Sequence, residues 1–120
     1  MIGIAGAFGA MARFALTNFL MHTLGRGFPF GTLVVNVLGS VLMGFLAIWL
    51  SSRWQMPLEY RIAILTGFLG AFTTFSAFSI DALALIERNQ WLLALLYIGA
   101  TVLLCILGAR GGMLLAERLA

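Results

Sequence analysis

Residues 67–79 read GFLGAFTTFSAFS, and the fold prediction for the remaining chain starts from this segment. It lies within a long apolar run, yet it contains two glycines, two threonines and two serines. Glycine weakens a helix by about 1 kcal/mol relative to alanine, and hydroxyl side chains offer the backbone other hydrogen-bond partners. Because a segment that only spans lipid needs none of these residues, they predict a discontinuous membrane helix whose freed backbone groups and hydroxyls line an ion site.

Phenylalanines in this region recur at spacings of four, three and three residues, at Phe68, Phe72, Phe75 and Phe78. This spacing places them along one face of a helix. A phenylalanine stripe alone favours ordinary packing against neighbouring helices. The alternative is that Phe75 and Phe78 turn their ring edges, which carry the positive end of the aromatic quadrupole, toward a small hard anion.

The composition indicates an integral membrane protein. Of the 120 residues, 62% are hydrophobic and 9% are charged, and the mean hydropathy is +1.09. Soluble domains carry about 25% charged residues. The chain has room for four helices of about 20 residues and for no soluble domain. Its net charge of +3 comes from scattered arginines, so we expect no nucleic-acid partner.

Catalysis has little support in the sequence. His22 is the only histidine and falls near a membrane interface, and Cys105 is the only cysteine and falls in an apolar run. The four carboxylates show no metal-ligand spacing. We therefore expect that the protein is not an enzyme and that its polar residues handle an ion.

The apolar runs predict one all-α domain, residues 1–120, with four membrane spans at about 2–21, 31–50, 61–86 and 91–116. The third span is longer than a straight crossing of a ~30 Å hydrocarbon core requires. An interruption between Gly70 and Phe75 would use the extra length. The pair Gly108 and Gly112, four residues apart in the fourth span, predicts a close helix contact.

Polar side chains inside these spans include Arg13, Asn36 and Asp81. A charge as deep as Arg13 costs ~2.5–3.5 kcal/mol on insertion scales, so Arg13 either pairs with a neighbouring helix or faces an aqueous, anion-attracting vestibule. A buried amide must form hydrogen bonds, so Asn36 either bridges two helices or points its NH₂ group at an anion. The spacing leaves both pairs of alternatives open. Asp81 could pair with Arg13 or Arg110.

The arginines also bear on orientation. Four spans put both termini and the middle loop on one side, with Arg53, Arg61 and Arg118, and leave Arg26 and Arg88 on the other. Three against two is a weak positive-inside signal. A chain with so little bias can insert both ways, and four helices are few for enclosing a pore. We therefore expect an antiparallel, dual-topology homodimer.

Three segments together resemble a known family. They read GAFGAMARF at 6–14, GTLVVNVLG at 31–39 and TGFLGAFTTFSAFS at 66–79. They resemble the Fluc (CrcB-type) fluoride channels of bacteria, and the resemblance extends to chain length and the four-span layout. It implies a channel of the bacterial inner membrane that exports toxic fluoride passively, driven by the membrane potential and by acid-trapped fluoride inside.

The resemblance also implies an antiparallel homodimer in the lipid bilayer, with two fluoride pores at the subunit interface. Its implied pore residues are Asn36, Phe75, Phe78, Ser79 and Thr32. The Ser76 hydroxyl is a further donor that can replace water around the anion. Arg13 would lie at the vestibule.

A sodium ion is the cofactor that the resemblance implies. The helix break would expose the carbonyls of Gly70 and Thr73, and two carbonyls from each subunit would hold a structural Na⁺ on the dimer axis. The sequence departs from the family pattern at Ala77, where a threonine is expected, so one hydroxyl of the polar track is missing. Tyr97 and Thr101, four residues apart, are candidates to complete that track.

Two other functions compete with the channel. A small proton-coupled drug or cation exporter would have a similar size, but it needs a carboxylate in the first span, where this chain has Arg13. A non-transporting membrane assembly subunit would use every polar residue for helix packing. The hydroxyl-rich third span argues against that role.

Overall fold

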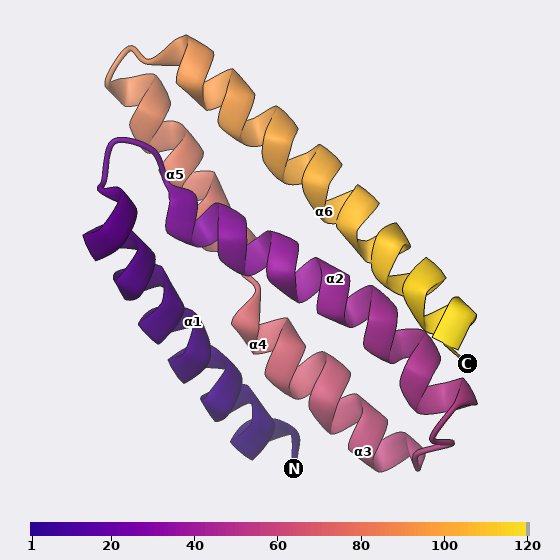
Figure 1. Cartoon of the computed structure of the whole chain (residues 1–120). Helices are drawn as coiled ribbons and strands as arrows, with labels where there is room; N and C mark the ends of the chain where they lie inside the picture. The colour runs from indigo at the N-terminus through magenta and orange to yellow at the C-terminus, as the bar shows by residue number, and fades with distance from the viewer. Residues whose placement is uncertain (120) are drawn as a thin grey trace.

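The structure, a computed structural model, describes residues 1–119 as a bundle of helices (Figure 1). Four helical spans within these residues are long and apolar enough to cross a membrane. Three are single helices: α1 (Ile2–Leu24), α2 (Phe30–Ser52) and α6 (Trp91–Leu119). The third span in chain order comprises α3 (Leu58–Ile62), η1 (Ala63–Leu69), α4 (Gly70–Phe72) and α5 (Phe75–Glu87). The prediction of an all-α membrane fold with four spans and a broken third helix is confirmed.

Glycine and proline set three of the helix ends. α1 ends before Gly25, whose φ of 87° lies in the left-handed region that favours glycine. α2 begins directly after Pro29. The third span begins at Leu58, earlier than predicted, because Pro57 precedes a helix readily while its missing N–H would interrupt one. The predicted spans were therefore correct in number and order but too short at several ends.

The interruption of the third span falls at two threonines. Thr73 (φ −85°, ψ 158°) and Thr74 (φ −152°, ψ 119°) are extended. The Thr74 hydroxyl oxygen then accepts a hydrogen bond from the Ala77 amide at 3.1 Å and caps α5. Gly70 stays helical, with φ −62° and ψ −35°. The break lies within the predicted interval, but the threonines form it rather than the glycine.

The segment before the break is unusually wide. η1 is a π-helix, a rare geometry that is frequent at functional sites. Its Gly67 lies against α1, where an added Cβ would come within 2.9 Å of the Ile2 carbonyl oxygen and 3.0 Å of the Ala5 Cβ. The lack of a side chain at Gly67 therefore lets η1 pack directly on α1.

Small residues also bring α2 and α6 into backbone contact. An added Cβ on Gly44 would overlap the Ala109 carbonyl, and one on Gly112 would overlap the Val41 carbonyl. Glycine at such positions is typical of membrane helices that pack tightly without a hydrophobic driving force. The close contact predicted for the fourth span is confirmed, and it fixes α6 against the helix that carries Asn36.

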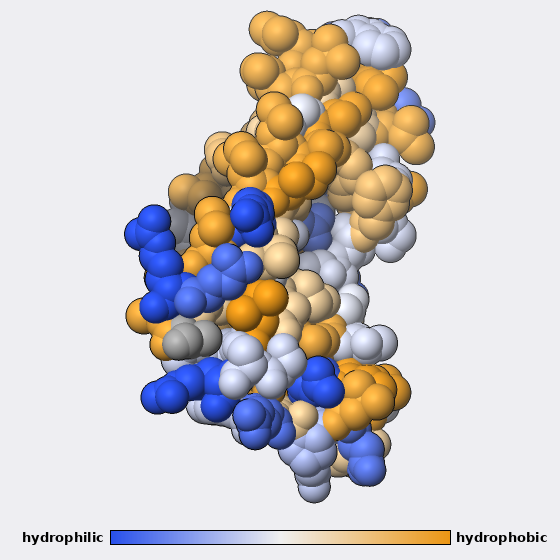
Figure 2. Space-filling model, turned by 90° about the vertical axis from the view of Figure 1, so that its right-hand side faces the viewer, coloured by the Kyte–Doolittle hydropathy of each residue, from blue (hydrophilic) through white to orange (hydrophobic). Residues whose placement is uncertain are grey.

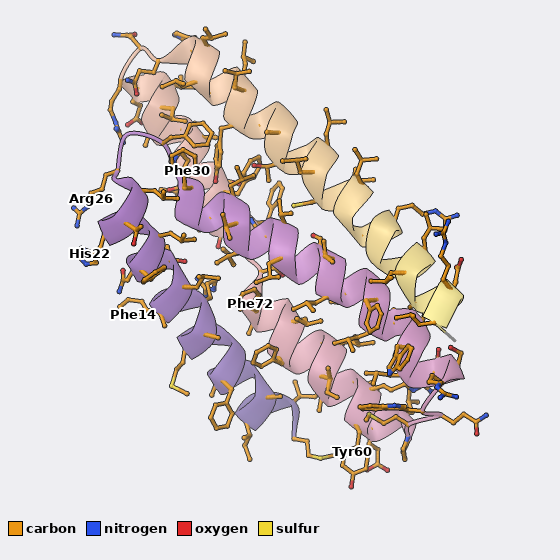
Figure 3. The ribbon with its side chains drawn as sticks, viewed as in Figure 1. Phe14, His22, Arg26, Phe30, Tyr60 and Phe72 are labelled. Carbon is orange, nitrogen blue, oxygen red and sulfur yellow. The ribbon has the colours of Figure 1, made fainter. Side chains whose placement is uncertain are left out.

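The two ends of the bundle hold different connections. The N-terminus, the α2–α3 connection and the last turn of α6 lie at one end, and the α1–α2 and α5–α6 connections lie at the other (Figure 1). Figure 3 shows Tyr60 at the first end and His22 with Arg26 at the second. The termini therefore share a side with the middle loop, as predicted.

The face formed by α6 is hydrophobic over much of its length (Figure 2). Its exposed side chains include Leu92, Leu95, Leu103, Ile106 and Leu107. A soluble monomer rarely exposes so large an apolar surface. Together with the four apolar spans, this face identifies a multi-pass membrane protein.

Candidate functional site

The carboxamide of Asn36 joins α2 to the broken third span. Its Nδ2 donates to the Thr74 carbonyl at 2.9 Å, and its Oδ1 accepts from the Thr74 amide at 2.7 Å. Because a backbone N–H can only donate, this pair of bonds fixes which end of the carboxamide is oxygen. Asn36 therefore bridges two helices, the first of its two predicted roles. One Nδ2 hydrogen is left over for the second role.

Arg13 of α1 also binds next to the break. Its Nε donates to the Ala71 carbonyl at 3.0 Å, and the side chain is half-buried. In an unbroken helix that carbonyl would accept from residue 75. Arg13 thus satisfies a backbone group that the break releases, and its guanidinium can serve a vestibule only through its remaining N–H groups.

Two more carbonyls lose their usual helical partners at the break. The Thr74 amide, which would bond to Gly70 in a continuous helix, donates to Asn36 instead. The Ala77 amide, which would bond to Thr73, donates to the Thr74 hydroxyl oxygen. Gly70 is also exposed on the surface of the chain. These are the two carbonyls named from the sequence as sodium ligands.

A cavity of about 410 Å³ lies beside the break, bounded by α2, α5 and α6; we call it the break cavity. Asn36, Phe75 and Phe78 all line it. Phe75 is 76% exposed, whereas Phe78 is 7% exposed. Three of the six predicted pore residues, separated by up to 42 positions in the chain, are thus brought together here.

α6 adds two residues to the break cavity, Thr101 and Cys105. Thr101 is 6% exposed, and its hydroxyl has no hydrogen-bond partner among the described residues. Cys105 is half-buried. The sequence pointed to Thr101 through its spacing from Tyr97. Nothing in the sequence placed Cys105 at a cavity, because a cysteine in an apolar run looks like any other small core residue.

A second cavity, of about 240 Å³, lies under the α1–α2 connection; we call it the loop cavity. Thr32, Asp81, Arg26 and Arg88 line it. The Thr32 hydroxyl donates to Asp81 Oδ2 at 2.6 Å, and the Tyr97 hydroxyl donates to the same oxygen at 3.4 Å. Two hydroxyls, rather than either arginine considered from the sequence, are the hydrogen-bond partners of Asp81.

A row of aromatic rings connects the two cavities. Ring centroids of Phe75 and Phe78 lie 5.3 Å apart at an interplanar angle of 50°, and those of Phe78 and Tyr97 lie 5.2 Å apart at 46°. Tilted pairs of this kind leave ring edges directed past their neighbours. The row begins in the break cavity at Phe75 and ends at the Tyr97 hydroxyl, which reaches Asp81 in the loop cavity.

The two predicted serines line neither cavity. The Ser79 hydroxyl donates to the Phe75 carbonyl at 3.1 Å, within its own helix. Ser76 is exposed, and its hydroxyl lies 3.3 Å from that of Thr74. Thr32 lines the loop cavity instead of the break cavity. The chain by itself therefore splits the predicted polar track into separate parts.

Comparison with known proteins identifies the family. A family model described as CrcB-like protein, Camphor Resistance (CrcB), matches residues 1–113. The chain belongs to the CrcB-like family. A curated protein from Magnetococcus marinus, named fluoride-specific ion channel FluC, is 46% identical over 116 residues, which are 97% of this CrcB-like chain and 94% of the relative. A protein of the same name from Rhizobium meliloti is 43% identical over 96% of the chain and 92% of the relative.

A third relative of this CrcB-like chain differs in length. The fluoride-specific ion channel FluC of Methylococcus capsulatus is 50% identical over 119 residues, 99% of this chain. The chain spans only 52% of that relative. The family expected from the three sequence motifs is thus confirmed over nearly the whole CrcB-like chain.

Proposed function

We propose that this protein is a fluoride-selective channel that lets toxic fluoride leave the cytoplasm passively. The observation that carries the proposal is the broken third span, which brings Asn36, Phe75 and Phe78 to one cavity at membrane depth. Near-full-length relatives at 46% and 43% identity are named fluoride-specific ion channels. The driving forces are the membrane potential and the trapping of fluoride at the higher internal pH.

The chemistry of the break cavity suits a small anion that holds its hydration shell tightly. The free Nδ2 hydrogen of Asn36 replaces one water, and the edges of Phe75 and Phe78 supply weakly positive C–H groups. None of these groups carries a full positive charge. The anion can therefore enter and still leave, which is the condition for conduction.

The aromatic row leads from the break cavity toward the loop cavity. Its far end is closed in the single chain, because Tyr97 is buried and its hydroxyl, like that of Thr32, donates to the Asp81 carboxylate. Arg26 and Arg88 line that cavity and raise the local anion concentration there. A single chain does not enclose a path for the ion, so a partner subunit must form the remaining wall. We assign Ser76 and Ser79 to the part of the path that the partner completes.

The functional unit that we propose is an antiparallel homodimer in the bacterial inner membrane. The 76% exposure of Phe75, which lines the same cavity as the Asn36 amide, supports a covering partner. The nearly balanced arginines, three on one side and two on the other, support insertion in both orientations. Each dimer would hold two pores.

A structural Na⁺ is the cofactor that we propose for this dimer. Carbonyl oxygens suit a hard cation, and the break frees the carbonyls of Gly70 and Thr73 from their helical partners. Gly70 is exposed, so a second subunit can approach it. The ion would neutralise carbonyls that otherwise lie unpaired at membrane depth.

Fluoride efflux from liposomes tests the channel. Purified protein is reconstituted into vesicles loaded with potassium fluoride, and a fluoride electrode follows efflux after valinomycin is added. We expect rapid efflux that needs no proton gradient and excludes chloride. Trapped fluoride that stays inside contradicts the proposal and favours an assembly subunit.

The same vesicles test the exporter alternative. Proton-coupled movement of an organic cation without fluoride efflux would favour a small drug exporter. α1 has Arg13 and no carboxylate, so the first span lacks the group that exchanges protons for cations. The names of the relatives also do not favour this alternative.

A further inference from the structure

The α1–α2 connection, residues 25–29, places one aromatic ring against the last ring of the aromatic row. Ring centroids of Phe28 and Tyr97 lie 5.5 Å apart at an interplanar angle of 89°, the edge-to-face arrangement that aromatic pairs favour. Phe28 is half-buried and packs on the core cluster that contains Phe78 and Tyr97. It also lines the loop cavity, which Tyr97 does not. The Phe28 ring therefore lies between the end of the row and the loop cavity.

Two further residues belong to the same wall. Thr32 and Asp81 line the loop cavity, and Asp81 accepts hydrogen bonds from the hydroxyls of Thr32 and Tyr97. Thr32 is part of α2 and Asp81 is part of α5, so helical hydrogen bonds hold both backbones in place. Of the three wall residues, only Phe28 lies outside a helix. Phe28 is therefore the member of the wall that can move without a span moving.

The connection that carries Phe28 is weakly held. The backbone amides of Arg26, Gly27 and Phe28 donate to no backbone carbonyl among the residues that the structure describes. Gly25 has a φ of 87°, and a Cβ added to Gly25 or Gly27 would meet no atom within 4 Å. Segments with few backbone hydrogen bonds and few packed neighbours open at a low cost in free energy. Outward movement of this connection would take the Phe28 ring out of the wall.

We propose that Phe28 is a gate for fluoride: its ring closes the loop-cavity end of the aromatic row and opens that end when the connection moves outward. The inference deepens the proposed channel function and rests on it. An apolar ring at a narrow point excludes an ion, because the ion would lose water there without gaining other partners. With the ring displaced, the Thr32 and Tyr97 hydroxyls become accessible from the loop cavity and can rotate to donate to the anion. Arg26 and Arg88 line the same cavity and offset the charge of Asp81.

Removal of the ring gives the first test. Full-length protein with Phe28→Ala, reconstituted into the fluoride-loaded vesicles, should release fluoride at least about threefold faster than the unaltered chain, because the closed state loses its ring. Phe28→Trp keeps a ring in the wall and should leave efflux unchanged or lower it. A ring that only supports the fold predicts the opposite sign for alanine, because a destabilised channel conducts less. Efflux through folded Phe28→Ala protein at or below that of the unaltered chain overturns the proposal.

Two further variants keep this test decisive. If Phe28→Ala protein does not elute as a single species from a sizing column, Phe28→Leu takes its place, and its smaller side chain should still raise efflux. Phe19→Ala is the matched control, since Phe19 belongs to α1, is 63% exposed and lines neither cavity. It should leave efflux unchanged. An equal rise in Phe19→Ala would indicate general loosening of the bundle and would overturn the assignment to Phe28.

Accessibility behind the wall gives a second test that does not depend on conduction. Ala94 is 1% exposed, belongs to the core cluster on which Phe28 packs and lines neither cavity. In a Cys105→Ser background, Ala94→Cys therefore carries the only thiol of the chain behind the ring. An anionic thiosulfonate, 2-sulfonatoethyl methanethiosulfonate, should label it at least about tenfold faster when Phe28→Ala is added, and no faster when Phe19→Ala is added.

The two tests separate the gate from the channel. Equal labelling rates with and without the Phe28 ring overturn the gate, whatever the efflux. If neither the unaltered chain nor any variant releases fluoride, the channel proposal fails, and the labelling rates still decide whether Phe28 closes this end of the row. Faster labelling together with faster efflux supports both.

Discussion

The Asn36 carboxamide holds the fold together at the break, and in our proposal the same side chain also serves the ion. Two of its hydrogen-bonding groups hold the Thr74 backbone, and one N–H remains. The rule that a buried amide needs partners predicted that Asn36 forms bonds. It could not predict which ones, because the partner lies 38 residues away and is a backbone group released by a helix break.

Replacing Asn36 with aspartate tests both tasks at once. The carboxylate still accepts from the Thr74 amide, but it cannot donate to the Thr74 carbonyl and it repels an anion in the break cavity. We expect fluoride efflux to fall at least about tenfold and the free energy of unfolding to fall by about 1–3 kcal/mol. Efflux measurement and thermal unfolding in detergent are the two readouts. Normal efflux through Asn36→Asp would contradict the assigned role.

The two phenylalanines that line the break cavity differ in burial, so the effects of replacing them should differ too. Phe75→Ile should lower fluoride efflux with little loss of stability, because Phe75 is 76% exposed. Phe78→Ile should lower efflux and also cost about 0.5–1.5 kcal/mol, since its ring packs on Tyr97. Phe14 points away from the bundle in Figure 3 and is 70% exposed, so Phe14→Ile is the matched control. Equal efflux from all three variants would reject the ring-edge contact.

Contacts between side chains on different helices were the hardest to predict. The sequence left open a pairing of Asp81 with Arg13 or Arg110, but two hydroxyls are its partners. Thr32, one of these, was predicted as a pore residue, yet it lines a different cavity from Asn36. A single sequence shows residue types and spacing along one helix. It does not show which helices face one another, so the division into two cavities was out of reach.

The third span shows which features of a helix can be predicted from its sequence. Glycines and hydroxyls within an apolar run located the interruption to within a few positions. The choice of Thr73 and Thr74 depended on Asn36 and Arg13, which satisfy the released backbone groups. The π-helical segment before the break was not predicted; its Gly67 packs directly on α1.

The contact between α2 and α6 gives a stability test with a neighbouring control. Gly112→Ala adds a Cβ that would overlap the Val41 carbonyl, so the helices must separate. We expect a loss of about 1–3 kcal/mol in the free energy of unfolding, seen as a lower melting temperature in detergent. Gly111→Ala adds a Cβ with no atom within 4 Å and should be neutral or slightly stabilising. Equal melting temperatures would show that the close contact does not limit stability.

The assembled protein is the level at which sodium should act. If Gly70 and Thr73 carbonyls of two subunits share one Na⁺, removing the ion leaves several carbonyls unpaired at the subunit interface. We expect the dimer to melt earlier, or to dissociate, when Na⁺ is replaced by N-methylglucamine at equal ionic strength. At 100 times the dissociation constant, bound ligand contributes about 2.7 kcal/mol. Melting that is indifferent to Na⁺ would remove the ion from the proposal.

The break at Thr73 and Thr74 also has an electrostatic consequence. Aligned peptide units give a helix about half a positive elementary charge at its N-terminus and half a negative one at its C-terminus. The helical run ending at Phe72 therefore directs its negative pole at the gap, and α5, which starts at Phe75, directs its positive pole there. One interruption thus creates opposite poles a few residues apart, so a cation and an anion can each find a complementary pole of the peptide backbone without any formally charged side chain.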